Sequence, residues 1–446
     1  MGRTTDTESD ASSSPPPGDG QHEVSELSIW QSMRDYPAFR VLFGSTLATN
    51  SGFWMWNIAI GWLALILTDS PFFVGLVGFT AGIPTLMFGP FGGVLIDKFP
   101  RKFILILAQT VISATAISVS VLLFLDLLQP WMLLVGAFIN GMSMSLVFPT
   151  RSAMVANLIP KQHLPNAIAL NSAGLNATRV IGPALAGPSI AILGVEGTFA
   201  LCAGLQVSSF IFSLRLPWHP ASDSGRGSGV VKSIAIGFQT VWHSEKLLGL
   251  FALAAIPTLC LMPHVHLMPV FARDELMIGS TGLGILMAVS GVGAVLGSLF
   301  VAAARTLPTR PVVLIFGSST FATVLILFSL TPYPVLAAVF LLVAGFASAV
   351  FLAVNNTLVQ LQVDDQVRGR VLGIYGLTWG LMPVGTLPAG AIADAFGAPA
   401  AMIALATTAL VLIAIVAIRF PSLRRAALPE SGVEPKQVQP ASRTAG

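Results

Sequence analysis

The chain has 446 residues, of which 54% are hydrophobic and 10% are charged, and its mean hydropathy is +0.80. A soluble domain is about one quarter charged, so most of the surface of this protein must face lipid. The formal net charge is only +3, and the basic residues lie in short loops and tails, which argues against nucleic acid as a partner. Cys202 and Cys260 both fall in apolar segments and predict no disulfide framework.

Residues 1–28 are polar and acidic, which predicts a disordered tail rather than a signal peptide. Beyond this tail, apolar segments of membrane-spanning length recur twelve times, since a transmembrane helix needs about 20 apolar residues. The predicted spans are 39–67, 72–96, 103–125, 131–153, 166–193, 196–216, 247–271, 281–304, 311–330, 333–361, 371–393 and 398–418.

One long polar connection separates the sixth span from the seventh. The sequence therefore predicts an all-α membrane protein with two six-helix bundles and a cytoplasmic tail at each end. The predicted limits are 1–28 for the first tail, 29–216 for the N-terminal bundle, 217–246 for a cytoplasmic linker, 247–420 for the C-terminal bundle and 421–446 for the second tail.

Basic residues are unevenly distributed between the two sets of loops. If the N-terminus is cytoplasmic, the inner loops hold thirteen lysines and arginines and the outer loops hold only Arg273. Because cytoplasmic loops carry the excess of basic residues, both termini are expected to be cytoplasmic. The inner set is Lys98, Arg101, Lys102, Arg151, Lys161, Arg215, Arg226, Lys232, Lys246, Arg305, Arg310, Arg368 and Arg370.

The two halves of the chain repeat each other weakly. Adding 204 to the residue number maps Gly93 onto Gly297 and Arg101 onto Arg305, whereas Asp97 has no acidic counterpart. Small residues that recur at packing positions allow close helix crossings. A parallel repeat of this kind is one plan of secondary transporters, which bind their substrate between the halves.

A short turn between the second and third spans places Asp97 within a few residues of a basic cluster. The spacing of Gly93, Asp97, Arg101 and Lys102 resembles the loop between helices two and three of major facilitator transporters. The resemblance implies a twelve-helix secondary transporter in which these four residues hold the inward gate.

The first span is the most polar. Asn50, Trp54, Asn57 and Gly61 are spaced 4, 3 and 4 residues apart, which places them on one helical face. Amides and an indole are costly in hydrocarbon, so this face is expected to line a substrate cavity or to form hydrogen bonds to a neighbouring helix.

Arg179 is the only charge deep in the predicted spans, and no carboxylate falls at its depth. An intramembrane arginine is a candidate for binding an anionic substrate. The alternative is that Arg179 binds helix carbonyls or the amides of Asn171 or Asn176.

Gly182, Pro183 and Gly187 follow Arg179 and predict a kink and close packing. They resemble the fifth-helix Gly-Pro motif of major facilitator antiporters, which implies export. The longer string from Pro149-Thr150-Arg151 to Gly182-Pro183 resembles the enterobactin-exporter and secretion-type efflux branch of that family.

His264 and His266 lie in the outer part of the seventh span, two residues apart, and therefore point to different sides of a helix. A histidine titrates near physiological pH, so either residue is a candidate for proton coupling, with a structural role as the alternative. The arginine that many proton-coupled facilitators carry in the fourth helix is replaced here by Ala137.

These observations predict a secondary active transporter that exports a small amphiphilic molecule, a siderophore or drug-like compound, across the cell inner membrane by alternating access. The expected partners are this substrate, the lipid bilayer and protons as the coupling ion. We expect a monomer with no cofactor, no metal and no bound nucleic acid. An importer of a small metabolite on the same fold and a non-transporting membrane sensor remain alternatives. An enzyme is not expected, because the sequence contains no metal cluster, nucleophile triad or P-loop.

Overall fold

The computed structural model describes residues 31–218, 230–304 and 310–424. Within these ranges every regular secondary-structure element is a helix. The predicted tail 1–28 and most of the predicted tail 421–446 lie outside the described residues. The helices before the long connection are α1 Gln31–Asp35, α2 Pro37–Thr68, α3 Pro71–Lys98, α4 Arg101–Phe124, α5 Pro130–Leu158 and α6 Leu164–Leu214.

Beyond the connection, α7 Val230–His243 leads into the second half of the chain. The helices that follow are α8 Glu245–Cys260, α9 His264–Val270, α10 Gly279–Ala303, α11 Val312–Leu330, α12 Pro334–Leu361, α13 Asp365–Thr378, α14 Met382–Phe396 and α15 Ala398–Arg419. A π-helical turn, η2 Phe271–Glu275, follows α9, and the 3-10 turns are η4 Trp379–Leu381 and η5 Pro421–Arg424.

Local chemistry explains where several helices begin. Proline occupies the first turn of α2, α3, α5 and α12, where its missing N–H is not needed and its fixed φ suits the helix. Ser70 also caps α3 by accepting a hydrogen bond from the Phe73 amide. Within a bilayer, a helix satisfies the hydrogen bonds of its backbone internally. A single apolar segment that crosses the membrane is therefore expected to be helical.

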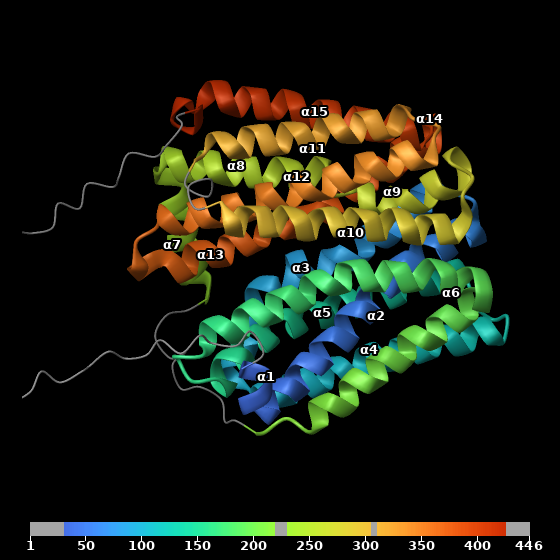
Figure 1. Ribbon diagram of the computed structural model, residues 1–446, viewed down its shortest axis with the longest axis horizontal. Helices are drawn as coiled ribbons and strands as arrows, with labels where there is room; N and C mark the ends of the chain where they lie inside the picture. Colours follow the sequence, from blue (N-terminus) through green and yellow to red (C-terminus); the bar gives the residue numbers. More distant parts are fainter. Residues whose placement is uncertain (1–30, 219–229, 305–309, 425–446) are drawn as a thin grey trace, which may run out of the picture.

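Eleven helices in the described ranges are long and apolar enough to cross a membrane, against twelve predicted spans. The difference lies in α6, which contains both the fifth and the sixth predicted spans in 51 residues. A straight helix of that length would exceed a hydrocarbon core of about 30 Å more than twofold. Instead, α6 breaks at Gly194, where φ is +74°, and its two arms run in opposite directions (Figure 1).

Two predicted spans are discontinuous. The seventh is divided between α8 and α9 by the turn at residues 261–263, and Pro257, Pro263 and Pro269 lie in or near that break. The eleventh is divided between α13 and α14 by η4, with Pro383 directly after it. Proline removes a helical hydrogen bond, which accounts for both interruptions.

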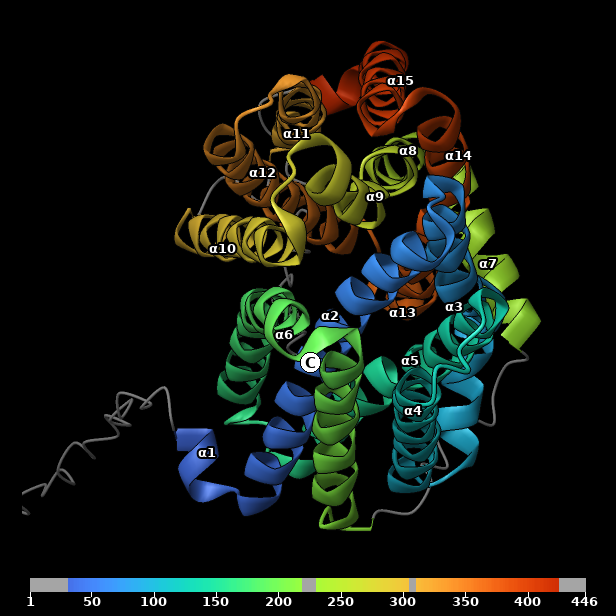
Figure 2. The same cartoon turned by 90° about the vertical axis from the view of Figure 1, so that its right-hand side faces the viewer.

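The membrane-length helices form two groups. In the first, α2 packs on α6, α3 on α5, and α4 on α5 and α6. In the second, α12 packs on α10 and α11, and α15 on α11 and α14. Between the groups, α6 packs on α10, α3 on α14 and α2 on α9 (Figures 1 and 2). We call the end at which α1 and α7 lie the inner end, and the opposite end the outer end.

Large apolar side chains remain exposed on many of these helices, for example Ile192, Phe316 and Ile418. Exposed apolar surface on this scale is incompatible with water and suits hydrocarbon. The protein is therefore a multi-pass membrane protein.

Candidate functional site

A narrow pocket lies where α2 of the first group meets α9 and α10 of the second. Its walls are mostly apolar, with one indole, one amide and one imidazole among them. The lining residues are Trp54, Asn57, Ile58, Gly61, Val265, His266, Pro269, Leu283 and Met287. Few polar groups in an apolar wall are typical of small-molecule sites.

Arg179 approaches this pocket from the first arm of α6. Its guanidinium carbon lies 5.7 Å from the centre of the Trp54 ring, within the range of a cation–π interaction. One helical turn later, a Cβ on Gly182 would lie 2.5 Å from Cβ of Trp54 and 3.0 Å from the Ser51 carbonyl oxygen. The glycine therefore allows α6 to cross α2 closely enough to place Arg179 over Trp54.

The two asparagines of α2 have different surroundings. Asn57 is half-buried, lines the pocket, and donates a 2.8 Å hydrogen bond to the Phe53 carbonyl of its own helix. Asn50 is only 4% exposed, is not part of the pocket wall, and donates to the Thr46 carbonyl. Of the predicted polar face, the structure thus places Trp54, Asn57 and Gly61 in the pocket wall, with Arg179 over Trp54, and places Asn50 in helix packing.

The histidines of α9 point to different sides, as their spacing predicts. His266 reaches the pocket and packs against α3, where a Cβ on Gly78 would lie 2.7 Å from the His266 ring nitrogen Nδ1. His264 is buried within the second group, with its Nδ1 2.7 Å from the Leu261 carbonyl and its ring edge-on to Phe321. Only His266 therefore faces the interface between the groups.

The Gly-Pro stretch of α6 packs directly against the second group. A Cβ on Gly187 would lie 2.5 Å from the Ser280 carbonyl oxygen and 2.8 Å from Cα of Gly284, so no larger residue fits there. Pro183 is buried in the same arm. Small residues on both sides of this crossing let the α6 and α10 backbones touch.

At the outer end, polar contacts link the two groups. Arg273 of η2 pairs with Asp69 at the end of α2, with 2.6 Å between Nη2 and Oδ1, and also donates to the Leu65 carbonyl. Asp394 of α14 accepts hydrogen bonds from the Ser70 hydroxyl, at 2.7 Å, and from the Phe72 amide, so it caps the start of α3. These contacts were not predicted, although Arg273 is the one basic residue assigned to the outer loops.

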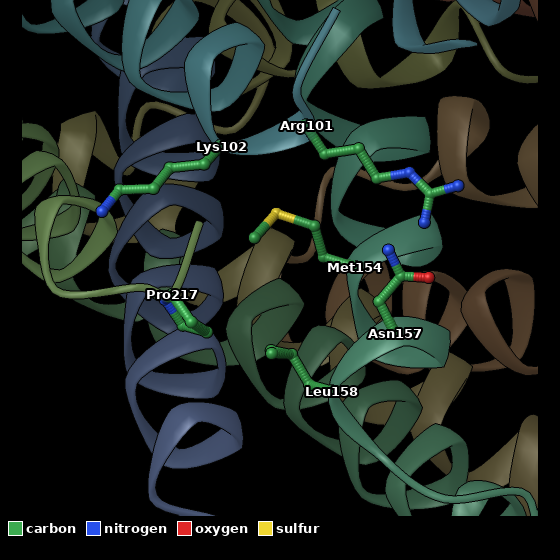
Figure 3. A pocket seen from close by; sticks show the side chains of 6 residues that line it. All are labelled: Arg101, Lys102, Met154, Asn157, Leu158 and Pro217. Carbon is green, nitrogen blue, oxygen red and sulfur yellow. The ribbon is translucent and has the colours of Figure 1, made fainter. Parts of the chain in front are cut away.

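At the inner end, Arg101 and Lys102 bind carbonyls within the first group. Arg101 donates a 2.9 Å hydrogen bond to the Ala153 carbonyl, and Lys102 donates to the Leu214 and Leu216 carbonyls where α6 ends. Their side chains point to opposite sides of a small pocket (Figure 3). Gly93 and Asp97 fall in the last turns of α3, but the surroundings of these two residues lie outside the described part of the structure.

The assignment of Arg151 to an inner loop is wrong. Helix α5 continues to Leu158, beyond the predicted end of the span, and Arg151 is buried inside the first group with 5% exposure. Its Nη2 contacts four oxygens: the Ser45 carbonyl, and the hydroxyls of Ser45, Thr49 and Ser209 at 2.9, 2.7 and 3.1 Å. Arg179 is therefore not the only deep charge.

The sequence analysis missed the serines and threonines that contact the Arg151 guanidinium. Ser45 and Thr49 lie one turn apart on α2, and Ser209 and Ser213 lie one turn apart on α6. Such pairs place hydroxyls on one helical face and can hold a buried cation without a carboxylate. Arg151 joins α5 to α2 and to the second arm of α6.

Packed groups of membrane-length helices with a largely apolar pocket at their interface are typical of secondary transporters. The profile of the transmembrane secretion effector family matches residues 28–441, nearly the whole chain, so the protein belongs to this family of the major facilitator superfamily. Members of this superfamily are transporters rather than enzymes, and the chain is therefore a transporter.

Curated relatives are exporters by name. The chain is 28% identical over 382 residues to the multidrug efflux pump Tap of Mycolicibacterium fortuitum, covering 82% of this chain and 91% of the relative. It is 27% identical over 382 residues to the enterobactin exporter EntS of Escherichia coli O127:H6, covering 82% and 90%.

Solved transporters share the fold at low identity. The nucleoside transporter NupG superimposes with a TM-score of 0.69 at 15% identity, covering 86% of this chain and 99% of that structure. A bacterial homologue of the human lysosomal transporter Spinster gives 0.68 at 15% identity, covering 87% and 99%.

We predict that Arg151→Met lowers the stability of the first group without changing its fold. The substitution removes the hydrogen bonds from Nη2 to the Ser45, Thr49 and Ser209 hydroxyls, and a hydrogen bond to a charged group contributes about 1.5–3 kcal/mol. The unfolding midpoint of the purified protein in detergent should fall clearly, while Arg40→Met, at an exposed arginine of α2, should leave it unchanged. Equal midpoints for the two variants would contradict the structural role of Arg151.

Proposed function

We propose that the protein exports a small amphiphilic molecule, a siderophore or drug-like compound, across the bacterial inner membrane. The observation that carries this proposal is the pocket between the groups, in which an apolar wall meets Trp54, Asn57 and His266, with Arg179 over the indole. An aromatic or apolar body suits the wall and an anionic group suits Arg179. The names of the curated exporters support the outward direction.

Transport would proceed by alternating access, with the two groups moving as bodies about the pocket. In the first group, Arg151 and Lys102 connect α4, α5, α2 and α6 to one another. Across the interface, by contrast, the groups meet on glycines and on the outer contacts of Arg273 and Asp394. In the described part of the structure, charged side chains join helices within a group but cross the interface only at its outer end, which favours movement of whole groups.

The outer contacts would act as the outer gate, and Gly93, Asp97, Arg101 and Lys102 as the inner gate. With the outer contacts made, the pocket is closed toward the outer end by the crossings of α6 with α10 and of α3 with α14. The orientation follows from the excess of basic residues at the inner end, which remains when Arg151 is removed from the count. Both termini would then be cytoplasmic.

Proton coupling would use His266. It is the titratable residue in the pocket wall, and it lies against Gly78 of the opposite group, so a change in its charge would affect the interface directly. His264 is held by packing inside the second group and is the weaker candidate.

The cargo is tested by accumulation of a panel of fluorescent or labelled compounds in cells with and without the protein. Lower accumulation of amphiphilic anions is expected, and Arg179→Ala should weaken their binding about 10- to 100-fold, the equivalent of a charge-assisted hydrogen bond of about 1.5–3 kcal/mol. Arg179→Lys is the matched control that keeps the charge. If Arg179→Ala weakened the binding of anionic and neutral compounds equally, the arginine would have a structural role.

The outer gate is tested by labelling a cysteine placed at Met287 in the pocket wall with a membrane-impermeant maleimide from outside. Asp69→Asn should raise the labelling rate up to about fivefold, because an exposed ion pair contributes at most about 1 kcal/mol. Asp126→Asn, at an exposed carboxylate after α4, should leave the rate unchanged. The same rate in Asp69→Asn and in the parent protein would refute the gate.

Proton coupling is tested in inverted vesicles, in which export appears as uptake. A protonophore should abolish uptake by the wild-type protein. His266→Gln should remove the dependence on the pH gradient, whereas His243→Gln, at an exposed histidine of α7, should not. Uptake that persists after the proton gradient collapses would point to another driving force.

A further inference from the structure

The predicted linker contains a helix that lies at the bilayer surface. Helix α7 ends at His243, and α8, which begins the membrane-length segment Glu245–Glu275, starts at Glu245, so a single residue separates them. The last turn of α7 must therefore lie at the depth where the bilayer meets water. Figure 1 shows α7 at the inner end, running across the direction of the spanning helices, and Figure 2 shows it at the edge of the molecule.

One side of α7 packs on the protein. A Cβ on Gly237 would lie 2.6 Å from Cδ1 of Ile374 and 3.0 Å from the Arg370 carbonyl oxygen, so the α7 backbone touches α13 there. Val241, one turn later on the same side, is 6% exposed. Helix α7 also contacts α8 and α3.

Next to this protein-facing side is an exposed apolar side. At about 100° per residue, Phe238 and Trp242 point about 40° apart, and Ala235 lies about 20° beyond Trp242 on the same side of the helix. The side chains of Phe238 and Trp242 are 53% and 75% exposed. Two large aromatic residues one turn apart, both uncovered, form a continuous apolar strip along a helix that is otherwise docked.

The next side around the helix is polar. Gln239 and His243 follow Phe238 and Trp242 by one position each, and both are exposed. The His243 ring nitrogen Nδ1 lies 2.8 Å from the Gln239 carbonyl, so the ring is held on this side. Around α7, a side that packs on the protein is thus followed by an exposed apolar side and then by an exposed polar side.

We propose that α7 is an interfacial helix whose Phe238 and Trp242 side chains insert at the boundary between headgroups and acyl chains of the inner-end leaflet. This order of sides is the one required of a helix lying in the membrane plane beside a spanning bundle: one side on the protein, one in lipid and one in water. Tryptophan is enriched at this depth, where its ring meets both environments. The bilayer is already present there because α8 enters it, so no further partner is needed to cover the strip. The proposal does not depend on the cargo or the direction of transport.

The test places one cysteine at a time at positions 238, 242, 239 and 243 of the full chain, labels each with an environment-sensitive fluorophore, and reconstitutes the protein into phosphatidylcholine–phosphatidylglycerol vesicles. Cys202 and Cys260 are buried and stay in place. The substituted side chains are all exposed, so folding should be retained, and gel filtration checks it.

Labels at 238 and 242 should emit at shorter wavelength and be quenched several-fold more by lipids with brominated acyl chains than labels at 239 and 243. Aqueous iodide should show the reverse order. Equal iodide quenching at all four positions would place the strip in water and overturn the proposal. Protection of 238 and 242 from both quenchers would also overturn it, because another protein surface would then cover the strip.

Discussion

In a bilayer, a polar group that leaves water must find its partner inside the protein, and this requirement explains most of what is specific in the structure. Arg151 shows it at one nitrogen: Nη2 is bonded to a carbonyl and hydroxyls from α2 and α6 rather than to a carboxylate, whereas Nε and Nη1 have no hydrogen-bond partner in the described part of the structure. Such a cluster can form only when three helices adopt one register. The polar cluster therefore sets the position of α2, and with it the positions of Trp54 and Asn57 farther along that helix.

The interface between the groups follows a different rule. Many of its tight contacts involve glycine: Gly187 meets Gly284 and Gly75 meets Gly390 backbone to backbone, and Gly82 meets the Pro383 ring. Close packing of backbones gives shape complementarity at little cost when it is broken, because no buried charge is uncovered. The charged contacts at the interface lie at the water-exposed outer end, where solvent can replace either partner. The contacts within a group and the contacts between groups thus differ in their chemistry.

Much of the fold could be predicted from hydrophobic length, because lipid leaves so few alternatives for a long apolar segment. The interruptions at residues 261–263 and at η4 were harder to place, since prolines such as Pro257 and Pro383 can kink a helix or break it according to what packs beside them. For the pocket, helical spacing correctly grouped Trp54 with Asn57, but it also included Asn50, whose burial depends on neighbours from other helices. Arg151 escaped notice because it lies two residues before the predicted end of its span and was counted with the inner loops, whereas α5 continues to Leu158 and neighbouring helices bury the side chain.

The cap that Asp394 provides for α3 has a consequence for how the outer end responds to its surroundings. The Asp69–Arg273 pair joins two full charges in contact with solvent, so dissolved salt screens it over a Debye length of about 8 Å at physiological ionic strength. Asp394 instead accepts short hydrogen bonds from a hydroxyl and a backbone amide, which salt weakens far less. Salt in the medium at this end therefore weakens one of the two contacts and leaves the other nearly untouched. A change in ionic strength would alter how firmly the two groups are held together there without changing the register of α3 on α14.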